Sequence, residues 1–277
     1  MNIYFKESHG RCLGTYPLKG QQLFEVIKNA YNVGYRFFDT AQMYENESDL
    51  GQSIKKLGIP RSKIFITTKV HPHNYTNNLF ISSVEQSLKF LETDYIDVLL
   101  LHWPDKNGDN SLSLELLEKT HKMGLAHHIG ISNYNIKMMK DAVSQLKIKP
   151  ITNQVEFHPL VNQSKLLVEA KKLGITLSAY CSVVRGQILD FPELHKLAKK
   201  NNKTVGQVVL RWIFQKGVIS NTMSTNPENI KNNFEIMDFT LDENDMLTIE
   251  NLNINDIRIV SKEIMPTDLR GCVPKWD

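Results

Sequence analysis

The sequence predicts a closed (β/α)8 barrel, and three observations lead to this prediction. Short, continuously apolar runs alternate with segments of helical periodicity, which is typical of parallel strands buried on both faces. Most of the helical segments end near a glycine just before the next run, as in repeated strand–helix units. Eight such units follow one another in 277 residues without a linker, so residues 1–277 are predicted to be one domain.

The eight predicted strands can be placed one by one. They cover residues 12–15, 36–39, 64–68, 96–101, 128–131, 151–155, 175–179 and 218–219. Between the first two strands, apolar residues recur at helical spacing from Leu23 to Tyr31, and similar stripes precede later strands. The glycines that end helices are Gly34, Gly58, Gly124, Gly174 and Gly217. Residues 1–11 are expected to form a small hairpin that closes the barrel floor.

An open, doubly wound sheet is the alternative fold. That fold normally carries G-x-G-x-x-G after an early strand, and this sequence has no such motif. A P-loop motif is absent as well. These absences favour the closed barrel.

Composition excludes several classes of protein. Hydrophobic residues make up 41% and charged residues 23%, which are ordinary globular values and exclude disorder, collagen and coiled coil. The net charge of +3 comes without a block of Lys or Arg, so no nucleic-acid partner is expected. The three cysteines are far apart, which argues against a disulfide framework or a zinc knuckle. Without a signal-like N-terminus or a membrane-length apolar run, we expect a cytoplasmic protein, and a monomer by default.

Polar residues at the carboxyl ends of barrel strands usually form the active site. The candidates at these positions are Asp39, Lys69, His102, Ser132, Asn133, Gln154, Tyr180, Cys181 and Ser182, and Tyr44 follows in the loop after Asp39. Each has an ordinary structural explanation when taken alone: Asp39 could cap a helix, Lys69 could lie at the surface, and His102 could be a core histidine. Their occurrence at successive strand ends favours a functional site.

Four of these residues form a chemically coherent set. A buried lysine requires a partner, and Asp39 is the natural one for Lys69. A lysine ammonium beside Tyr44 favours the phenolate and is expected to lower the tyrosine pKa. His102 can donate a hydrogen bond to a carbonyl oxygen. Such a site would polarise and protonate a carbonyl group, and it needs an external hydride source because the chain carries no metal or flavin motif.

The motifs in this order and spacing resemble those of the aldo-keto reductase family, over about residues 12–240. The matching segments are 34–41 (GYRFFDTA), 44–47 (YENE) with Gly51, 67–69 (TTK), 101–104 (LHWP), 129–133 (IGISN) and 153–156 (NQVE). The size and the short loop after His102 look most like the bacterial branch of 2,5-diketo-gluconate and methylglyoxal reductases. The resemblance implies NAD(P)H-dependent reduction of small aldehydes or ketones, such as methylglyoxal or keto-sugar acids.

The resemblance also implies roles for individual residues. Tyr44 would be the general acid, Lys69 would lower its pKa, Asp39 would hold Lys69, and His102 would orient the substrate carbonyl. The cofactor carboxamide would be held by Ser132, Asn133 and Gln154, and Tyr180 would stack on the nicotinamide. Further cofactor contacts would come from Thr15, Asp39, Cys181, Ser182, Ser224, Thr225 and Asn233. The substrate pocket would be lined by Tyr16, His71, His102 and Trp103.

The sequence departs from the family pattern at the cofactor phosphate. Met223 and Asn229 stand where a lysine and an arginine usually grip the 2′-phosphate of NADPH. This predicts a weaker preference for NADPH and use of NADH, unless a nearby lysine such as Lys231 substitutes.

A further departure and the C-terminal tail lie near the substrate pocket. His71 replaces a tryptophan, and with His73 it spells H-x-H; without a third ligand nearby, a solvated loop is favoured over a metal site. The tail 269–277 lacks helical periodicity and is expected to fold over the pocket mouth.

Two other functions stay open from the sequence. Lys69 could form a Schiff base in an aldolase, although pairing with Asp39 would keep it protonated. The chain could also be a cofactor-binding sensor or regulatory protein with little turnover, for which the altered phosphate grip leaves room.

Overall fold

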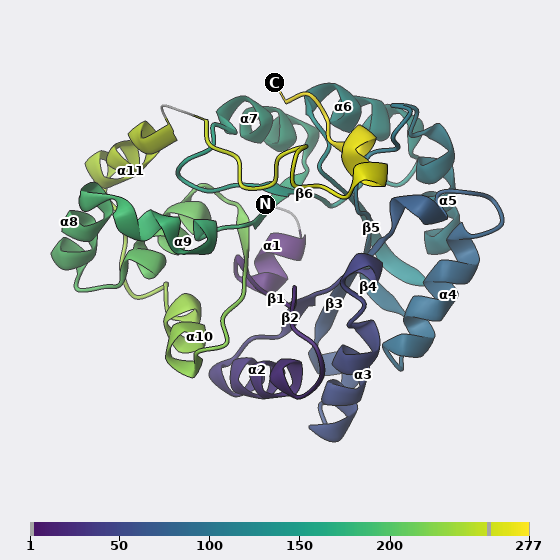
Figure 1. The fold of residues 1–277 in the computed structure, drawn as a ribbon, viewed down its shortest axis with the longest axis horizontal. Coiled ribbons are helices and arrows are strands. Elements are labelled where there is room, and N and C mark those ends of the chain that lie inside the picture. Colours follow the sequence, from purple (N-terminus) through teal and green to yellow (C-terminus); the bar gives the residue numbers. More distant parts are fainter. Residues whose placement is uncertain (1–2, 254–255, 277) are drawn as a thin grey trace.

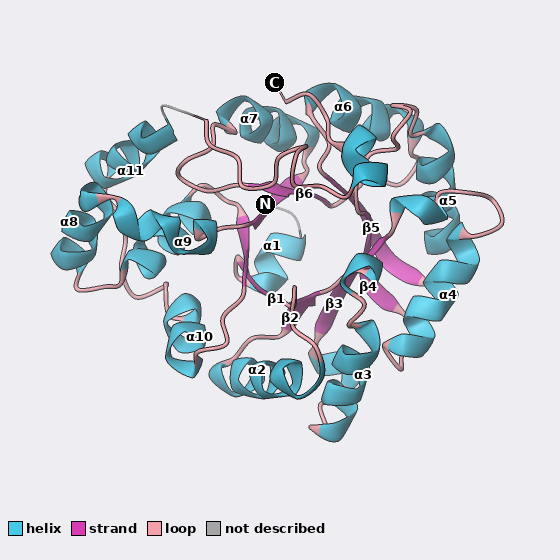
Figure 2. Ribbon diagram, in the orientation of Figure 1, coloured by secondary structure: helices cyan, strands magenta, loops and turns pink. Residues whose placement is uncertain are grey.

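The computed structural model describes residues 3–253 and 256–276, and in them eight parallel strands close into a barrel in sequential order. Figure 2 shows the strands as a ring with helices outside it. The strands are β1 (Arg11–Gly14), β2 (Phe37–Asp39), β3 (Phe65–Val70), β4 (Ile96–Leu101), β5 (Ala126–Ser132), β6 (Thr152–Glu156), β7 (Thr176–Tyr180) and β8 (Ile219–Thr222). The predicted (β/α)8 barrel is therefore confirmed, with boundaries that differ from the predicted ones by up to three residues.

Helices that connect the strands, and two that follow β8, pack around the barrel (Figure 1). They are α2 (Gly20–Val33), α3 (Glu47–Lys56), α4 (Phe80–Phe90), α5 (Ser111–Lys122), α6 (Ile136–Gln145), α7 (Ser164–Leu173), α8 (Pro192–Asn201), α9 (Val205–Gln215), α10 (Pro227–Phe234) and α11 (Glu243–Glu250). The apolar stripe predicted from Leu23 onward is the face that α2 buries, with Leu23 and Ile27 fully enclosed. Burial of these stripes against the strands forms the main core.

A glycine ends α2 for two physical reasons. Gly34 has a φ of 125°, a region that residues with a side chain rarely adopt. A Cβ atom at this position would also lie 2.7 Å from the Phe234 ring of α10. The glycine pattern in the sequence thus marks both the end of the helix and a close contact with its neighbour.

The prediction for the N-terminal segment is wrong in one respect. It closes the barrel floor, but as the short helix α1 (Ile3–Ser8) and not as a hairpin. Tyr4 packs against Phe37 of β2, and its hydroxyl lies 3.0 Å from Thr67 Oγ1 of β3. Phe5 is buried in the same cluster and stacks on Phe214 of α9. A helical turn lets both adjacent aromatic side chains be buried at the barrel floor, whereas in a strand they would point to opposite faces. Figure 1 shows α1 within the outline of the barrel.

The C-terminal segment after α11 returns to the opposite, carboxyl end of the strands. It contains a short 3-10 helix, η6 (Thr267–Cys272). Met265, Leu269 and Cys272 form a small apolar cluster with Trp103, which follows β4. Within residues 3–253 and 256–276, no helix has the length and apolar character needed to cross a membrane.

Candidate active site

A buried lysine lies at the centre of the site. Lys69 is fully buried on β3, and its Nζ donates to Asp39 Oδ1 at 2.5 Å and to the carbonyl oxygen of Thr40 at 2.8 Å. The third neighbour is the hydroxyl of Tyr44, 3.3 Å from Nζ. Tyr44 ends the short 3-10 helix η1 (Gln42–Tyr44), which begins three residues after β2. The adjacent strands β2 and β3 and the loop between them therefore bring together three residues that the sequence singled out.

Burial and charge act in opposite directions on this group. Burial disfavours the charge on Lys69, but Asp39 and Tyr44 outweigh it, and the pKa of Lys69 is raised. The lysine is thus protonated at neutral pH, which opposes its use as a Schiff-base nucleophile.

The expected lowering of the tyrosine pKa is not found. Burial raises the pKa of Tyr44, and the charge of Lys69 offsets this only in part. The prediction failed because the sequence shows the neighbouring lysine but not the depth of burial. Tyr44 consequently keeps its proton at neutral pH and can donate it.

His102 comes directly after β4, and its ring lies edge-on to Tyr44 with centroids 5.6 Å apart. Burial lowers the pKa of His102 well below its ordinary value, and the nearby Lys69 and His71 add to this effect. The imidazole is therefore neutral. Its buried Nδ1 has no hydrogen-bond partner among the described residues. A neutral imidazole beside a protonated tyrosine can hold and polarise a carbonyl oxygen.

The ends of β5, β6 and β7 carry hydroxyl, amide and aromatic groups. Ser132 Oγ donates to the carbonyl oxygen of Gln154 at 2.8 Å. Asn133 adopts a left-handed φ of 63° and donates to the carbonyl oxygen of His102 at 3.1 Å. The Tyr180 hydroxyl donates to Asn133 Oδ1 at 2.8 Å. These bonds fix the orientation of each side chain relative to the next strand end.

Gln154 has a contact that the motif analysis did not anticipate. Its Nε2 donates to Asp39 Oδ2 at 2.7 Å, across the barrel from β6 to β2. Asp39 therefore receives Lys69 on one oxygen and Gln154 on the other. The carboxylate is held in one orientation, and Gln154 is linked to the Tyr44 hydroxyl through Asp39 and Lys69.

Asn46, which lies within the YENE motif, supports the site structurally. It is fully buried and accepts from Thr40 Oγ1 at 2.6 Å. Its Nδ2 lies 3.2 Å from both oxygens of Thr15, and the Thr15 hydroxyl donates to the carbonyl oxygen of Asp39 at 3.0 Å. The YENE motif therefore contained a signal for this support.

The residues at the strand ends fit a nicotinamide. The amides of Asn133 and Gln154 and the hydroxyl of Ser132 match the polar atoms of a carboxamide, and Tyr180 offers a partly exposed aromatic ring. Next to it, Ser182 is buried and donates to the carbonyl oxygen of Ala179. Ser224 and Thr225 lie between the end of β8 and α10, and Asn233 lies in the last turn of α10. Burial raises the pKa of the Cys181 thiol to about 11, so this residue stays uncharged.

The region after β8 offers little positive charge to a phosphate. Met223 packs against the core, and Asn229 is exposed on α10. Lys231 is exposed too, and its Nζ is 3.9 Å from Glu235 Oε1. The first turn of α10 also carries the carboxylate of Glu228.

The expected substrate-pocket residues surround Tyr44 and His102. The Tyr16 ring lies 5.0 Å from that of Tyr44 and is 55% exposed, so it is open to solvent on one side. Trp103 follows His102 and is covered by the C-terminal cluster described above. His71 follows β3 and is half-buried. The tail packs on Trp103 through Leu269 and Cys272, and part of it is the 3-10 helix η6.

Glu156 anchors the C-terminal segment, and the sequence analysis gave it no role. It lies at the end of β6 and is 1% exposed. Its carboxylate accepts from the backbone N–H groups of Ile259 at 2.5 Å and Val260 at 3.0 Å, and from His158 Nε2 at 2.8 Å. The NQVE motif was a signal for a buried acid, but two of its three partners, Ile259 and Val260, lie 103 and 104 residues away along the chain.

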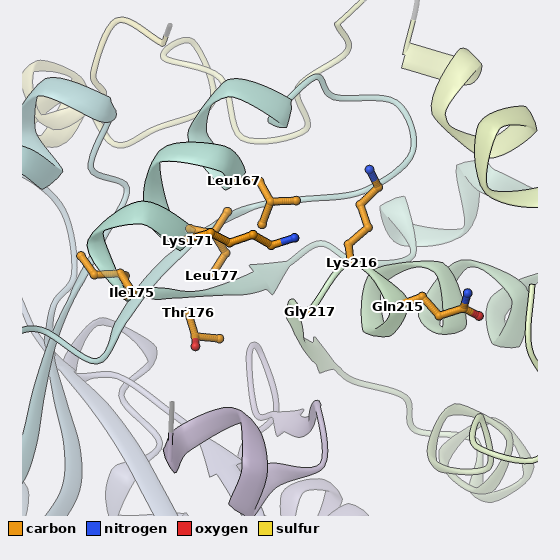
Figure 3. A pocket seen from close by; sticks show the side chains of 9 residues that line it. Leu167, Lys171, Ile175, Thr176, Leu177, Gln215, Lys216 and Gly217 are labelled. Atoms are coloured by element: carbon orange, nitrogen blue, oxygen red, sulfur yellow. The ribbon is translucent and has the colours of Figure 1, made fainter. Parts of the chain in front are cut away.

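A separate hollow of 260 Å³ lies at the other end of the barrel, between α7, β7 and α9 (Figure 3). Its charged lining residues are Lys171 and Lys216, and Lys216 Nζ is paired with Glu250 at 2.6 Å. None of the sequence-predicted site residues lines this hollow. Across the part of the chain that the structure describes, no three His, Cys, Asp or Glu residues are grouped to hold a metal ion.

Known proteins resemble this chain over most of its length. A model of the aldo/keto reductase family matches residues 12–254. A methylglyoxal reductase (DkgB) of Escherichia coli O157:H7 is 36% identical over 96% of this chain and 97% of that protein. A glyoxal reductase of Bacillus subtilis strain 168 is 38% identical over 87% of each chain.

Solved structures agree with this family match. A crystal structure provisionally assigned as a 2,5-diketo-D-gluconic acid reductase B superposes with a TM-score of 0.91. It is 37% identical in sequence, and the match covers 97% of this chain and 93% of that one. The aldo-keto reductase MGS-M4 from a deep-sea metagenome library superposes with a TM-score of 0.86 at 34% identity, over 91% and 93% of the two chains.

Proposed function

The chain belongs to the aldo/keto reductase family and is a nicotinamide-dependent carbonyl reductase, and from this premise we propose that it reduces small 1,2-dicarbonyl compounds of the methylglyoxal type. Two relatives that match most of the chain are named for methylglyoxal and glyoxal. The observation that carries the reaction class is the buried cluster in which Lys69 Nζ contacts both Asp39 and the Tyr44 hydroxyl.

We assign the proton-transfer step to Tyr44. Its hydroxyl donates a proton to the carbonyl oxygen as negative charge develops there, and the ammonium of Lys69 at 3.3 Å stabilises the phenolate that remains. Neutral His102 holds the carbonyl oxygen through a ring N–H. Asp39 keeps Lys69 charged and in place.

The cofactor, when bound, supplies the hydride that reduces the carbonyl carbon. We propose that Ser132, Asn133 and Gln154 hold its carboxamide and that Tyr180 lies against its ring. Contacts farther along the cofactor are proposed for Thr15, Cys181, Ser182, Ser224, Thr225 and Asn233. Because Gln154 also holds Asp39 at 2.7 Å, carboxamide binding and the orientation of Asp39 depend on the same side chain.

The test compares wild type with Tyr44→Phe, measuring loss of reduced-nicotinamide absorbance with methylglyoxal. Removal of a general acid typically costs about 10²- to 10⁴-fold in rate, so we expect a fall of that size in kcat. Tyr95→Phe is a matched control, since this tyrosine stacks on His127 at the other end of the strands. If Tyr44→Phe keeps wild-type kcat, the proposed acid is wrong; if wild type reduces no small carbonyl, the proposed substrate class is wrong.

We further propose that the chain uses NADH appreciably. The support is the neutral Met223 and Asn229 in the region of the expected 2′-phosphate, together with the carboxylate of Glu228. A charge-assisted hydrogen bond contributes about 1.5–3 kcal/mol, or about 10- to 150-fold in affinity. Met223→Lys with Asn229→Arg should therefore increase the preference for NADPH by at least about tenfold in KM. A large NADPH advantage in wild type that Lys231→Ala removes would instead identify Lys231 as the phosphate ligand.

We also propose that the chain forms one domain and that the protein is a monomer. The strands β1 and β8 pair with each other, so residues 11–222 close the barrel, and the C-terminal segment packs on its rim. The large exposed apolar side chains, such as Leu79, Val168 and Ile264, lie on different elements. Light scattering of the purified protein tests the monomer.

A further inference from the structure

His71 has one ring nitrogen committed to the local fold. Its Nδ1 accepts from the backbone N–H of His73 at 3.0 Å, at the start of the 3-10 helix η3 (Pro72–Asn74). A nitrogen that accepts from a backbone N–H carries no proton, so in the neutral ring the proton is on Nε2. The pKa of His71 is lowered by burial and by the adjacent His73, which keeps the ring neutral at pH 7. Nε2–H of His71 has no hydrogen-bond partner among the residues that the structure describes.

The backbone places this free donor at the rim of the site. Side chains alternate along an extended chain, so His71 shares the face of Lys69, which points into the barrel. The backbone of His71 remains extended (φ −67°, ψ 137°), and its N–H donates to Gln42 Oε1 at 2.8 Å. His71 is also close enough to His102 to lower the pKa of that ring.

The turn that carries His71 is fixed on its outer side as well. His73 Nε2 lies 2.7 Å from Asp268 Oδ2 of η6. The same 3-10 helix contributes Leu269 and Cys272 to the cluster on Trp103. The turn that carries the His71 ring is thus held on one side by the hydrogen bond to Gln42 and on the other by the C-terminal segment.

From this geometry we infer that His71 is a specificity-determining residue whose Nε2–H binds the second carbonyl oxygen of a 1,2-dicarbonyl substrate, while Tyr44 and His102 bind the first. The inference rests on the proposed function and adds to it the reason for a dicarbonyl preference. A monocarbonyl substrate has no group for this donor, and a donor that the bound substrate covers without pairing is costly. A tryptophan, which the family resemblance led us to expect here, would offer an indole N–H at a different place and no acceptor for the His73 amide.

Two substitutions separate this role from the structural one. In His71→Asn, the side-chain oxygen can replace Nδ1 as the acceptor for His73 N–H, as asparagine does in Asx-turns, but no donor reaches the place of Nε2. In His71→Gln, the longer amide can place an N–H near the position of Nε2, but the acceptor for His73 is lost. The two variants thus each keep one function of the ring.

The assay is kcat/KM for methylglyoxal and for propanal, which has the same carbon chain without the ketone oxygen. We expect His71→Asn to lower the methylglyoxal value by about 10- to 100-fold, the usual effect of losing a buried hydrogen-bond partner. The propanal value should change by less than about threefold, as for a neutral substitution. His71→Gln should retain a methylglyoxal-to-propanal ratio near that of wild type.

The outcomes distinguish this inference from the proposed function. If both substrates lose equally in His71→Asn, or if His71→Gln loses the ratio while His71→Asn keeps it, the ring only shapes the turn and the inference is overturned. If wild type reduces propanal but not methylglyoxal, the dicarbonyl proposal fails and the inference with it. Thermal unfolding of each variant shows whether the fold is retained.

Discussion

Replacing Glu156 by glutamine should release the C-terminal segment from the barrel. The buried carboxylate accepts three hydrogen bonds, from the amides of Ile259 and Val260 and from His158 Nε2. Since His158 Nδ1 accepts from the backbone N–H of Leu160, the ring proton is on Nε2, and all three partners of Glu156 are donors. A glutamine offers one acceptor oxygen and turns its NH2 group toward a remaining donor.

The size of the effect follows from these contacts. Loss of charge assistance, together with one buried donor left facing another, costs about 3 kcal/mol. Unfolding entropy of about 2.1 cal/mol/K per residue amounts to about 0.6 kcal/mol/K for this chain of 277 residues. The melting temperature of Glu156→Gln should therefore fall by about 5 °C.

The stability difference between wild type and Glu156→Gln should depend on pH. Burial opposes the charge on Glu156, but the bonds from His158, Ile259 and Val260 prevail, and the pKa of Glu156 is lowered. A carboxylate with a lowered folded-state pKa stabilises the fold above its unfolded-state pKa and loses this effect as the pH falls through the folded-state value. The difference between wild type and Glu156→Gln should be complete at neutral pH and should close in acid, below the ordinary glutamate pKa of 4.5.

Two measurements check this reasoning. Calorimetry reports the melting temperature, and amide hydrogen exchange reports whether residues 257–276 lose protection before the barrel does. Glu25→Gln is the control, because this acid is half-exposed and its pair with Lys28 at 3.6 Å should contribute little. A melting temperature within about 1 °C of wild type, with unchanged exchange in the segment, would refute Glu156 as its anchor.

Three further predictions concern the site and its support. Lys69→Met leaves the charge of Asp39 buried without its cation, so stability should fall by about 3–5 kcal/mol; adding Asp39→Asn should recover much of the stability but none of the activity, as unfolding and turnover assays can show. Because burial lowers the pKa of His102 well below 6.5, kcat/KM should show no step from this residue near that pH, and a step that His102→Gln removes would contradict the neutral ring. Gly51→Ala should destabilise the protein by at least about 2 kcal/mol, since a Cβ there would overlap the backbone at the end of α4. Gly206→Ala in α9 is the control, because the nearest atom to a Cβ there is 3.8 Å away. Denaturant titrations should show that this control is neutral or stabilising by up to about 1 kcal/mol.

The elements that the sequence predicted well are those specified locally. Continuous apolar runs such as β4, which matches residues 96–101 at both ends, can be recognised without knowing their partners. The candidate site residues could then be chosen from the strand ends, because a barrel places the carboxyl end of every strand on one rim. The N-terminal segment was predicted wrongly as a hairpin because six residues carry too little periodicity, and the helix α1 is stabilised by burial of Tyr4 and Phe5 at the barrel floor.

What the sequence could not provide is the set of contacts between distant segments. The bond from Gln154 to Asp39 joins residues 115 positions apart, and those from Glu156 reach 103 and 104 positions along the chain. No local pattern encodes such pairs, since each depends on barrel closure and on the path of the C-terminal segment. The bond from His73 to His71 was also missed, although the two residues are close in sequence, because H-x-H was read as a question of metal ligands.

Three buried acids, Asp39, Glu47 and Glu156, differ in the groups that surround them, and this difference supports the proposed role of Asp39 beside the proton donor. Glu156 is surrounded by N–H donors, and Glu47 by the hydroxyls of Thr68 and Ser87, so each is matched by groups that keep their protons. Asp39 is instead paired with Lys69, whose remaining neighbour is the hydroxyl of Tyr44. Of these three acids, only Asp39 holds a cation, Lys69, next to a second acid, the Tyr44 hydroxyl. The charge of Lys69 can stabilise the Tyr44 phenolate. Burial that raises the pKa of Tyr44 and a cation that stabilises its phenolate are therefore complementary, because the first keeps the proton available and the second lets it leave when the carbonyl oxygen becomes negative.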